Sequence, residues 1–167
     1  RLQGDWSSDV CSSDLPESEV KGLLALMLFH ESRRTARSDA RGDIVLLKDQ
    51  DRGLWDRAMI AEADQLLAGT EVGTYTLQAA ISGVHASAAS YDQTDWNQIV
   101  ALYQLLERFE PSPVVALNRA VAVSMVRGPQ AGLDLIDEIL QAGFLLEYSL
   151  AHSALVEMLA QGQRKAE

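Results

Sequence analysis

Cysteine is almost missing from this chain of 167 residues, because Cys11 is the only one. A lone thiol excludes an internal disulfide, and its place near the start excludes thiolate metal sites from the body of the chain. Long apolar runs are missing too: the longest runs from Leu23 to Phe29, whereas a membrane span needs about 20 residues. The first residues also lack the apolar segment of a signal peptide. We therefore expect a soluble, cytoplasmic protein that does not contact a membrane.

Basic residues are scarce, with 14 Lys and Arg against 24 Asp and Glu, for a net charge of −10. Proteins that bind nucleic acids carry a basic face that displaces phosphate counterions. We therefore expect no direct binding of this chain to DNA or RNA. The hydrophobic content of 47% and charged content of 23% are typical of globular domains.

The segment 1–15 differs from the rest of the chain. Ser-Ser-Asp occurs at 7–9 and again at 12–14, without a helical or strand period of apolar residues. A disordered tail and a Ser/Asp-rich capping or phosphorylation segment are two interpretations. A third fits better, because "DWSSDVCSSDL" resembles the in-frame translation of a sequencing adapter. We therefore predict a non-native leader at 1–15 and a single helical domain at 16–167, truncated at both ends relative to a parent protein.

Apolar residues beyond position 16 recur with a period of 3.6, which predicts an all-α chain. Asp95 with Gln98 predicts a capping box, and Ser112-Pro113 predicts another helix start. Seven helices are expected, at 16–34, 54–67, 74–88, 96–109, 113–126, 130–141 and 145–161. The first should bury a face made of Val20, Leu23, Leu24, Met27 and Leu28.

One segment, 35–47, does not follow this period. A glycine-containing turn at 40–43 precedes the β-branched pair Ile44-Val45, which predicts a small β-hairpin. A buried irregular loop is the alternative.

An internal repeat appears when the chain is shifted by about 34 residues. Leu106 then lies on Leu140, and Ala120 lies on Ala154. This period predicts a right-handed stack of antiparallel helix pairs that resembles tetratricopeptide repeats, in which each pair buries its apolar face on a neighbour. The second unit carries Asp137 where the first carries the aromatic Tyr103. The apolar pattern of the repeat is therefore matched better than its signature residues.

Catalytic and metal-binding patterns are not found in the sequence. The three histidines, His30, His85 and His152, do not share a helical face at metal-ligand spacing. A phosphate-binding glycine loop and a Gly-x-Ser-x-Gly elbow are also absent. We therefore predict a protein that is not an enzyme, with no catalytic residue, metal or cofactor.

Two groups of residues form a candidate interaction surface. The first is the one basic cluster of an acidic chain, although cations near a helix C-terminus also complement the helix dipole. The second is polar or aromatic and follows the expected repeat groove, where a buried polar residue needs a partner. The full set is Arg33, Arg34, Arg37, Arg41, Asp95, Trp96, Tyr103, Asn118 and Arg119.

Five ordered motifs carry a family resemblance. They are "EVKGLLALMLFHESRRTAR", "IVLLKDQDRGLWDRAMIAEA", "YTLQAAISGVHA", "TDWNQIVALYQLLERFEPSPVVALNRAVAV" and "GPQAGLDLIDEIL". Residues 16–163 resemble the C-terminal helical extension of bacterial extracytoplasmic-function (ECF) sigma factors.

The resemblance implies a regulatory, protein-interaction module whose parent directs RNA polymerase to specific promoters. It also implies partners among the parent's other domains, RNA polymerase or a regulatory protein. The promoter-reading domains of that family are absent from this sequence. A stand-alone helical scaffold and a small-molecule-sensing domain are the alternatives.

Overall fold

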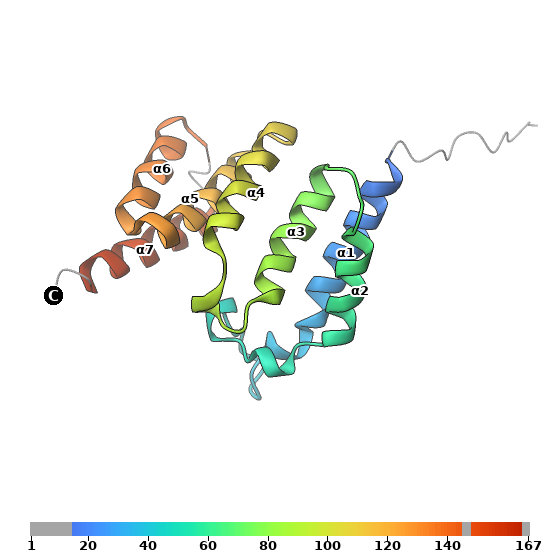
Figure 1. Cartoon of the computed structure of the whole chain (residues 1–167). Coiled ribbons are helices and arrows are strands. Elements are labelled where there is room, and N and C mark those ends of the chain that lie inside the picture. Colours follow the sequence, from blue (N-terminus) through green and yellow to red (C-terminus); the bar gives the residue numbers. More distant parts are fainter. Residues whose placement is uncertain (1–14, 145–147, 165–167) are drawn as a thin grey trace, which may run out of the picture.

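The computed structural model describes residues 15–144 and 148–164. Within these ranges the chain forms seven α-helices and no β-strand, which confirms the predicted all-α class (Figure 1). The helices are α1 (Glu17–Ser32), α2 (Arg57–Leu67), α3 (Thr74–Ser87), α4 (Trp96–Phe109), α5 (Pro113–Arg127), α6 (Pro129–Gln141) and α7 (Ser149–Arg164). Short 3₁₀ turns occupy η2 (Arg34–Ala36), η3 (Leu47–Asp49), η4 (Arg52–Leu54) and η5 (Tyr91–Gln93). The predicted leader lies outside the described residues except for Leu15.

Side-chain caps set several helix starts. The carboxylate of Asp95 accepts the Gln98 amide at 3.0 Å and begins α4 at the predicted residue. Ser112 accepts the Val114 amide at 3.3 Å, and Pro113 occupies the first turn of α5, where its missing N–H costs nothing. The chain leaves α5 at Gly128, whose φ of 93° is a conformation that favours glycine.

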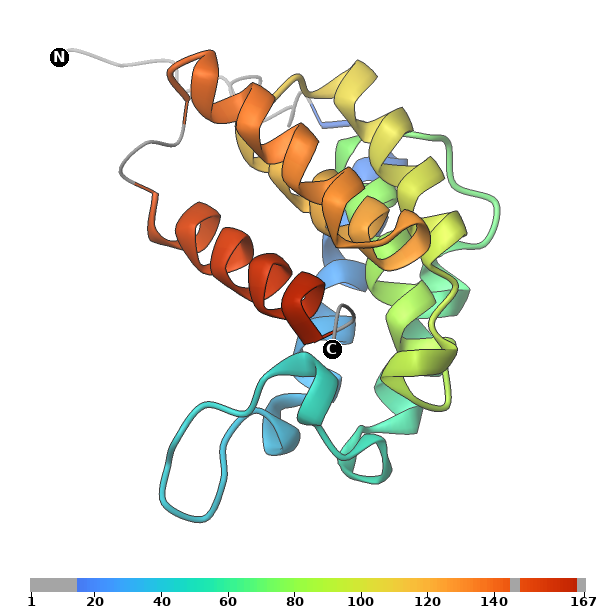
Figure 2. The ribbon, with the colours of Figure 1, turned by 90° about the vertical axis from the view of Figure 1, so that its left-hand side faces the viewer.

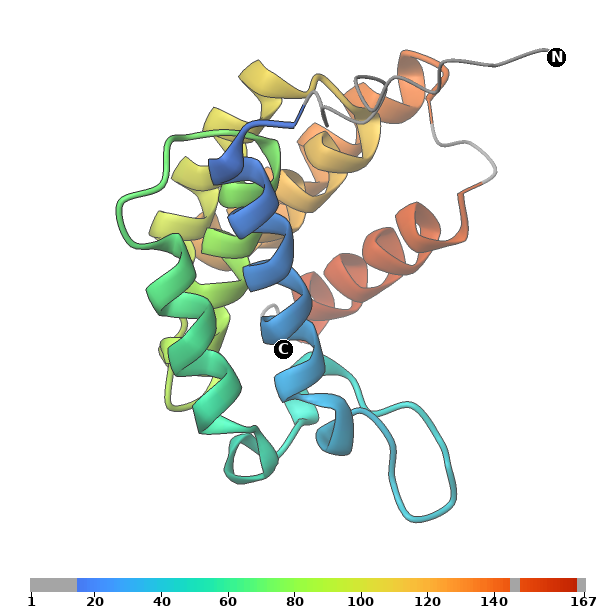
Figure 3. The same ribbon diagram turned by 90° about the vertical axis from the view of Figure 1, so that its right-hand side faces the viewer.

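The helices pack as a continuous stack, with α1 between α2 and α3, and with each helix from α3 to α7 contacting the next (Figures 1 and 3). Three clusters of buried apolar side chains fill it: one under α1 and α2, one between α3, α4 and α5, and one between α5, α6 and α7. None of the described helices is long and apolar enough to cross a membrane.

The predicted repeat pairs meet where α5 crosses α6. Ala120 on α5 is fully buried, and a Cβ added at Gly132 on α6 would lie 3.0 Å from the Ala120 carbonyl oxygen and 2.6 Å from the Ser124 Cβ. Small residues at these positions therefore allow the two helices to approach closely.

The predicted apolar face of α1 is wrong at Val20, Leu24 and Met27, which are exposed, whereas Leu23 and Leu28 are half-buried. Val20 and Met27 are 48% and 61% exposed, whereas Gly22, Ala25 and Phe29 are buried. The reason is the close contact with α3: a Cβ at position 22 would lie 2.6 Å from the Thr76 backbone nitrogen. Gly22 makes this contact, and the buried face of the helix continues through Ala25 and Phe29.

Other boundaries also differ from the predictions. The segment 35–47 contains a single antiparallel bridge, between Ser38 and Ile44, instead of a strand pair, and it projects from the body (Figures 2 and 3). The second helix begins at Arg57 and not at 54, because Asp56 caps it by accepting the Ala58 and Met59 amides. The predicted start of the last helix, at 145, lies outside the described residues.

Candidate functional site

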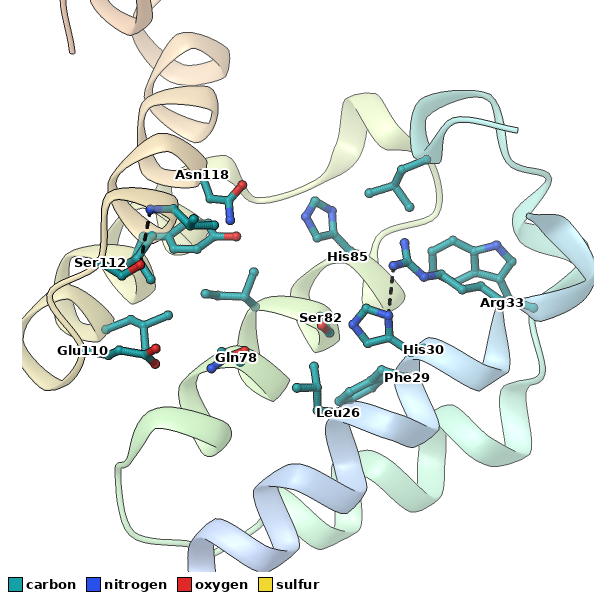
Figure 4. A pocket seen from close by; sticks show the side chains of 17 residues that line it. Leu26, Phe29, His30, Arg33, Gln78, Ser82, His85, Glu110, Ser112 and Asn118 are labelled. Atoms are coloured by element: carbon teal, nitrogen blue, oxygen red, sulfur yellow. Dashed lines mark hydrogen bonds between the residues drawn. The ribbon is translucent and has the colours of Figure 1, made fainter. Parts of the chain in front are cut away.

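A groove follows the inner side of the stack. It consists of two adjoining cavities of about 480 and about 660 Å³. Both are lined by Leu47, His85, Tyr103 and Asn118, so they form one continuous depression. The first cavity lies between the C-terminal end of α1, the length of α3 and the facing sides of α4 and α5 (Figure 4). The second continues toward α7, where Met158 lines it.

The loop between α1 and α2 forms a wall of this groove because two arginines fix it to the end of α3. Arg52 is 7% exposed and donates to the carbonyl oxygens of His85 and of Ala88, the latter at 3.2 Å. Arg57 donates to the Ala86 carbonyl at 3.3 Å. The last carbonyls of a helix have no partner within it and carry its negative pole, so guanidinium groups are well suited to cap them.

Trp55 belongs to the core and is 4% exposed. The Arg52 guanidinium lies 4.5 Å from the centre of its ring, a cation–π contact. The charges around Trp55 shape the backbone: Asp51 accepts the Gly53 amide at 2.8 Å, and Asp56 caps α2.

The α1 end of the groove is basic. Arg37 donates to the His30 carbonyl oxygen at 2.8 Å and to its ring Nδ1 at 3.0 Å, while an Arg33 nitrogen lies 3.4 Å from the same Nδ1 (Figure 4). A nitrogen that accepts from arginines carries no proton, so the second ring nitrogen of His30 holds it. Among the described residues, no carboxylate lies within ion-pairing distance of Arg33, Arg37 or Arg52.

Burial, together with these unpaired charges, lowers the pKa of three side chains at this end of the groove. Burial, assisted by Arg52 and Arg33, lowers the pKa of His85 from 6.5 to about 4. Burial, with Arg33 and Arg37, also lowers the pKa of His30. The pKa of Arg33 itself is lowered by burial and then by Arg37 and Arg52. Both imidazoles are therefore neutral at pH 7, and the positive charge of this end belongs to the arginines.

Aromatic rings form the middle of the groove. The His85 ring meets Trp96 edge to face with centroids 5.2 Å apart, and Tyr91 meets the same indole at 5.1 Å. Burial raises the pKa of the Tyr103 hydroxyl, which therefore stays protonated. The indole nitrogen of Trp96 is buried and has no hydrogen-bond partner in the described ranges.

The structure divides the predicted interaction surface. Four of its residues line the groove, namely Arg33, Trp96, Tyr103 and Asn118. The other five serve local structure: Arg34 pairs with Glu31, Arg41 with Asp39 and Asp43, Arg37 with His30, Arg119 with Glu107 at 2.8 Å, and Asp95 caps α4. Of the four arginines of the predicted basic cluster, Arg33 is the one that lines the cavity.

Sequence reasoning did not identify the groove histidines or Arg52 as site residues. His30 and His85 are far apart in sequence and meet only because α1 lies against α3. Arg52 lies among Asp49, Asp51 and Asp56, a pattern that indicates a solvated loop. No signal in the sequence places its guanidinium under the end of α3.

The walls of the first cavity offer one guanidinium, two neutral imidazoles, the carboxylate of Glu110, the amides of Gln78 and Asn118, and broad apolar surfaces. Within the ranges that the structure describes, no group of three or more His, Cys, Asp or Glu side chains gathers to hold a metal ion.

Comparison with known proteins gives two matches. A family model described as "Family of unknown function (DUF6596)" matches residues 7–71, which contain α1, α2 and the loop between them. The match begins inside the predicted leader, whose origin stays a prediction. The chain is also similar to "Uncharacterized protein R00370" of Rhizobium meliloti (strain 1021), with 52% identity over 127 residues.

The aligned region is 74% of this chain, and the chain spans 30% of the length of that relative. No solved structure matches the chain.

Proposed function

We propose that this chain is the regulatory, protein-interaction module of an ECF sigma factor, a cytoplasmic protein that directs RNA polymerase to specific promoters. In this proposal the module binds other domains of its parent, RNA polymerase or a regulatory protein, while the promoter is read by domains elsewhere in the parent. The strongly acidic composition agrees with a part that does not touch DNA.

The observation that carries the proposal is the convergence of the family motifs on one groove. Four of the five motifs, which are far apart in sequence, supply lining residues of the first cavity: Arg33, Trp55, His85 and Asn118 each come from a different one. Stacked helix pairs characteristically use such an inner surface to bind partners. The chain spans 30% of the length of the Rhizobium relative, which is compatible with one module of a longer protein.

The genomic locus provides the first test. The proposal predicts an open reading frame that joins this module to the two promoter-reading domains of an ECF sigma factor. An unrelated upstream domain at the locus would contradict the assignment.

A transcription assay provides the second test. The full-length parent would be compared with two variants, Asn118→Trp and Val126→Trp, in promoter-dependent transcription with purified RNA polymerase. Both positions are exposed on α5, but only Asn118 lines the groove. We expect the indole at 118 to fill the groove and to change promoter-dependent output, while the control keeps wild-type output. Equal promoter-dependent transcription by all three proteins would show that the groove is not involved in regulation.

A further inference from the structure

The basic end of the first cavity contrasts with the charge of the chain as a whole. The protein has a net charge of −10, yet Arg33, Arg37 and Arg52 gather at the end of α1 without a carboxylate partner among the described residues. Charged groups removed from water are costly unless they are paired. Arg37 is exposed and hydrated, whereas Arg33 is half-buried and faces the cavity. Its charge therefore remains available to a bound anion.

Unsatisfied polar atoms occur at the same end. Three buried atoms have no hydrogen-bond partner among the residues that the structure describes: the second terminal nitrogen of Arg52, the indole nitrogen of Trp55 and Nδ1 of His85. The first two belong to side chains that are more than nine-tenths buried. Buried polar groups in native proteins are nearly always paired, so a cluster of exceptions needs an explanation such as a ligand. Figure 4 shows His85 pointing into the cavity, near the guanidinium of Arg33.

The remaining walls select the body of the ligand. Leu26, Ile81, Tyr103 and Leu106 present apolar surface between the basic end and the far end of the cavity. At that far end lies Glu110, opposite Arg33 (Figure 4). A second negative charge on the ligand would therefore face a carboxylate. A volume of about 480 Å³ lies within the range of small-molecule sites.

We propose that this cavity binds a small organic monocarboxylate with an apolar or aromatic body. The carboxylate lies against the forked guanidinium of Arg33, which can donate two parallel hydrogen bonds, and next to His85. The body extends along Ile81 and Tyr103 toward α5. This inference does not rest on the sigma-factor proposal, because the binding belongs to the cavity and is measured on this chain alone.

The probe is 3-phenylpropionate, titrated into the purified chain by calorimetry at pH 7. Its neutral amide, 3-phenylpropanamide, has the same shape without the charge, and inorganic phosphate tests for general anion binding. We expect saturable binding of the carboxylate and at least about tenfold weaker binding of the amide and of phosphate, because a charge-assisted bidentate contact is lost. No saturation by the carboxylate up to about 10 mM, or equal affinity for the amide or phosphate, would overturn the proposal.

Two variants locate the site. Arg33→Gln should weaken binding of 3-phenylpropionate by at least about tenfold, because it removes the one guanidinium that lines the cavity among the described residues. Arg34→Gln is the matched control, since its neighbouring guanidinium is exposed and pairs with Glu31. It should bind within about twofold of wild type. Unchanged binding in Arg33→Gln, or equal loss in both variants, would place the ligand elsewhere.

A spectroscopic measurement on the wild-type protein keeps the test independent of variant folding. A carboxylate beside His85 offsets the positive charge of Arg33 and Arg52, so it should raise the pKa of His85 in an NMR titration. The amide should leave that pKa unchanged. A titration of His85 that is identical with and without saturating 3-phenylpropionate would refute the placement. The result says nothing about transcription, so the two proposals fail separately.

Discussion

Acidification should destabilise this protein through His85. The folded-state pKa of about 4 lies below the ordinary value of 6.5, because the ring is buried and faces Arg52 and Arg33, with Trp96 against its edge. The folded protein therefore resists protonation, while the unfolded chain accepts a proton as the pH falls through 6.5. The stability that the neutral ring contributes is complete at high pH and is lost as the pH falls from 6.5 toward 4.

The magnitude follows from the difference between the two pKa values. A shift from 6.5 to about 4 corresponds to about 3 kcal/mol when the pH has fallen below both values. A measurement at about pH 5.3 stays above the isoelectric point of 4.7, where aggregation would interfere. Between pH 7 and that value the linkage relation gives a loss of about 1.5 kcal/mol from His85.

The assay is urea unfolding of the wild type and of His85→Gln at both pH values. Carboxylates and the other histidines titrate in both proteins, so their contributions cancel in the comparison. We expect the wild type to lose about 1.5 kcal/mol more than the variant. Equal losses would refute the reasoning, as would an NMR titration of the folded protein that gives His85 a pKa near 6.5.

Three further predictions concern the packing and the charges. Gly22→Ala should lower the free energy of unfolding in urea by about 2–3 kcal/mol, because its Cβ would lie 2.6 Å from the α3 backbone. Gly83→Ala is the control: its Cβ would lie 3.2 Å from its nearest neighbour, so its free energy of unfolding should stay within about 1 kcal/mol of wild type. Arg52→Met should lower stability by about 2–4 kcal/mol by leaving α3 carbonyls unpaired, and an unchanged melting temperature would contradict this. Arg33→Gln should raise stability by up to about 1 kcal/mol at low salt, and the gain should shrink at high salt, where repulsion is screened.

Local signals predicted much of the fold. The caps at Asp95 and Ser112 act on neighbouring amides, so they fixed the starts of α4 and α5 without tertiary information. The buried face of α1 could not be predicted in this way. Its contacts depend on Gly22 and Ala25, and the value of a small residue appears only when the partner helix is in place. The segment 35–47 forms one bridge because its backbone bonds close a turn and no third strand extends it.

The candidate site was predictable only in part, because it also depends on how the helices pack against one another. Tyr103 and Asn118 follow the repeat period and were placed in the groove by it. His85 joins them through the packing of α3 against α1 and α4, which no spacing in the sequence encodes. The basic cluster was visible as a run, but a run does not show which guanidinium faces the cavity and which pairs with Glu31.

Arg33 and Arg52 are close in space and chemically identical, yet they should affect stability in opposite directions. One terminal nitrogen of Arg52 donates to two carbonyl oxygens at the end of α3, so its burial is compensated in part, and its removal would leave those carbonyls without that partner. Within the described part of the chain, Arg33 has a long contact with His30 and is repelled by two other arginines. A charge held in a cavity at a cost to stability is the arrangement expected of a residue kept for binding, in line with the general conflict between function and stability. If Arg33→Gln instead destabilised the chain as strongly as Arg52→Met, Arg33 would be a structural residue, and the basic end of the groove would be a consequence of folding alone.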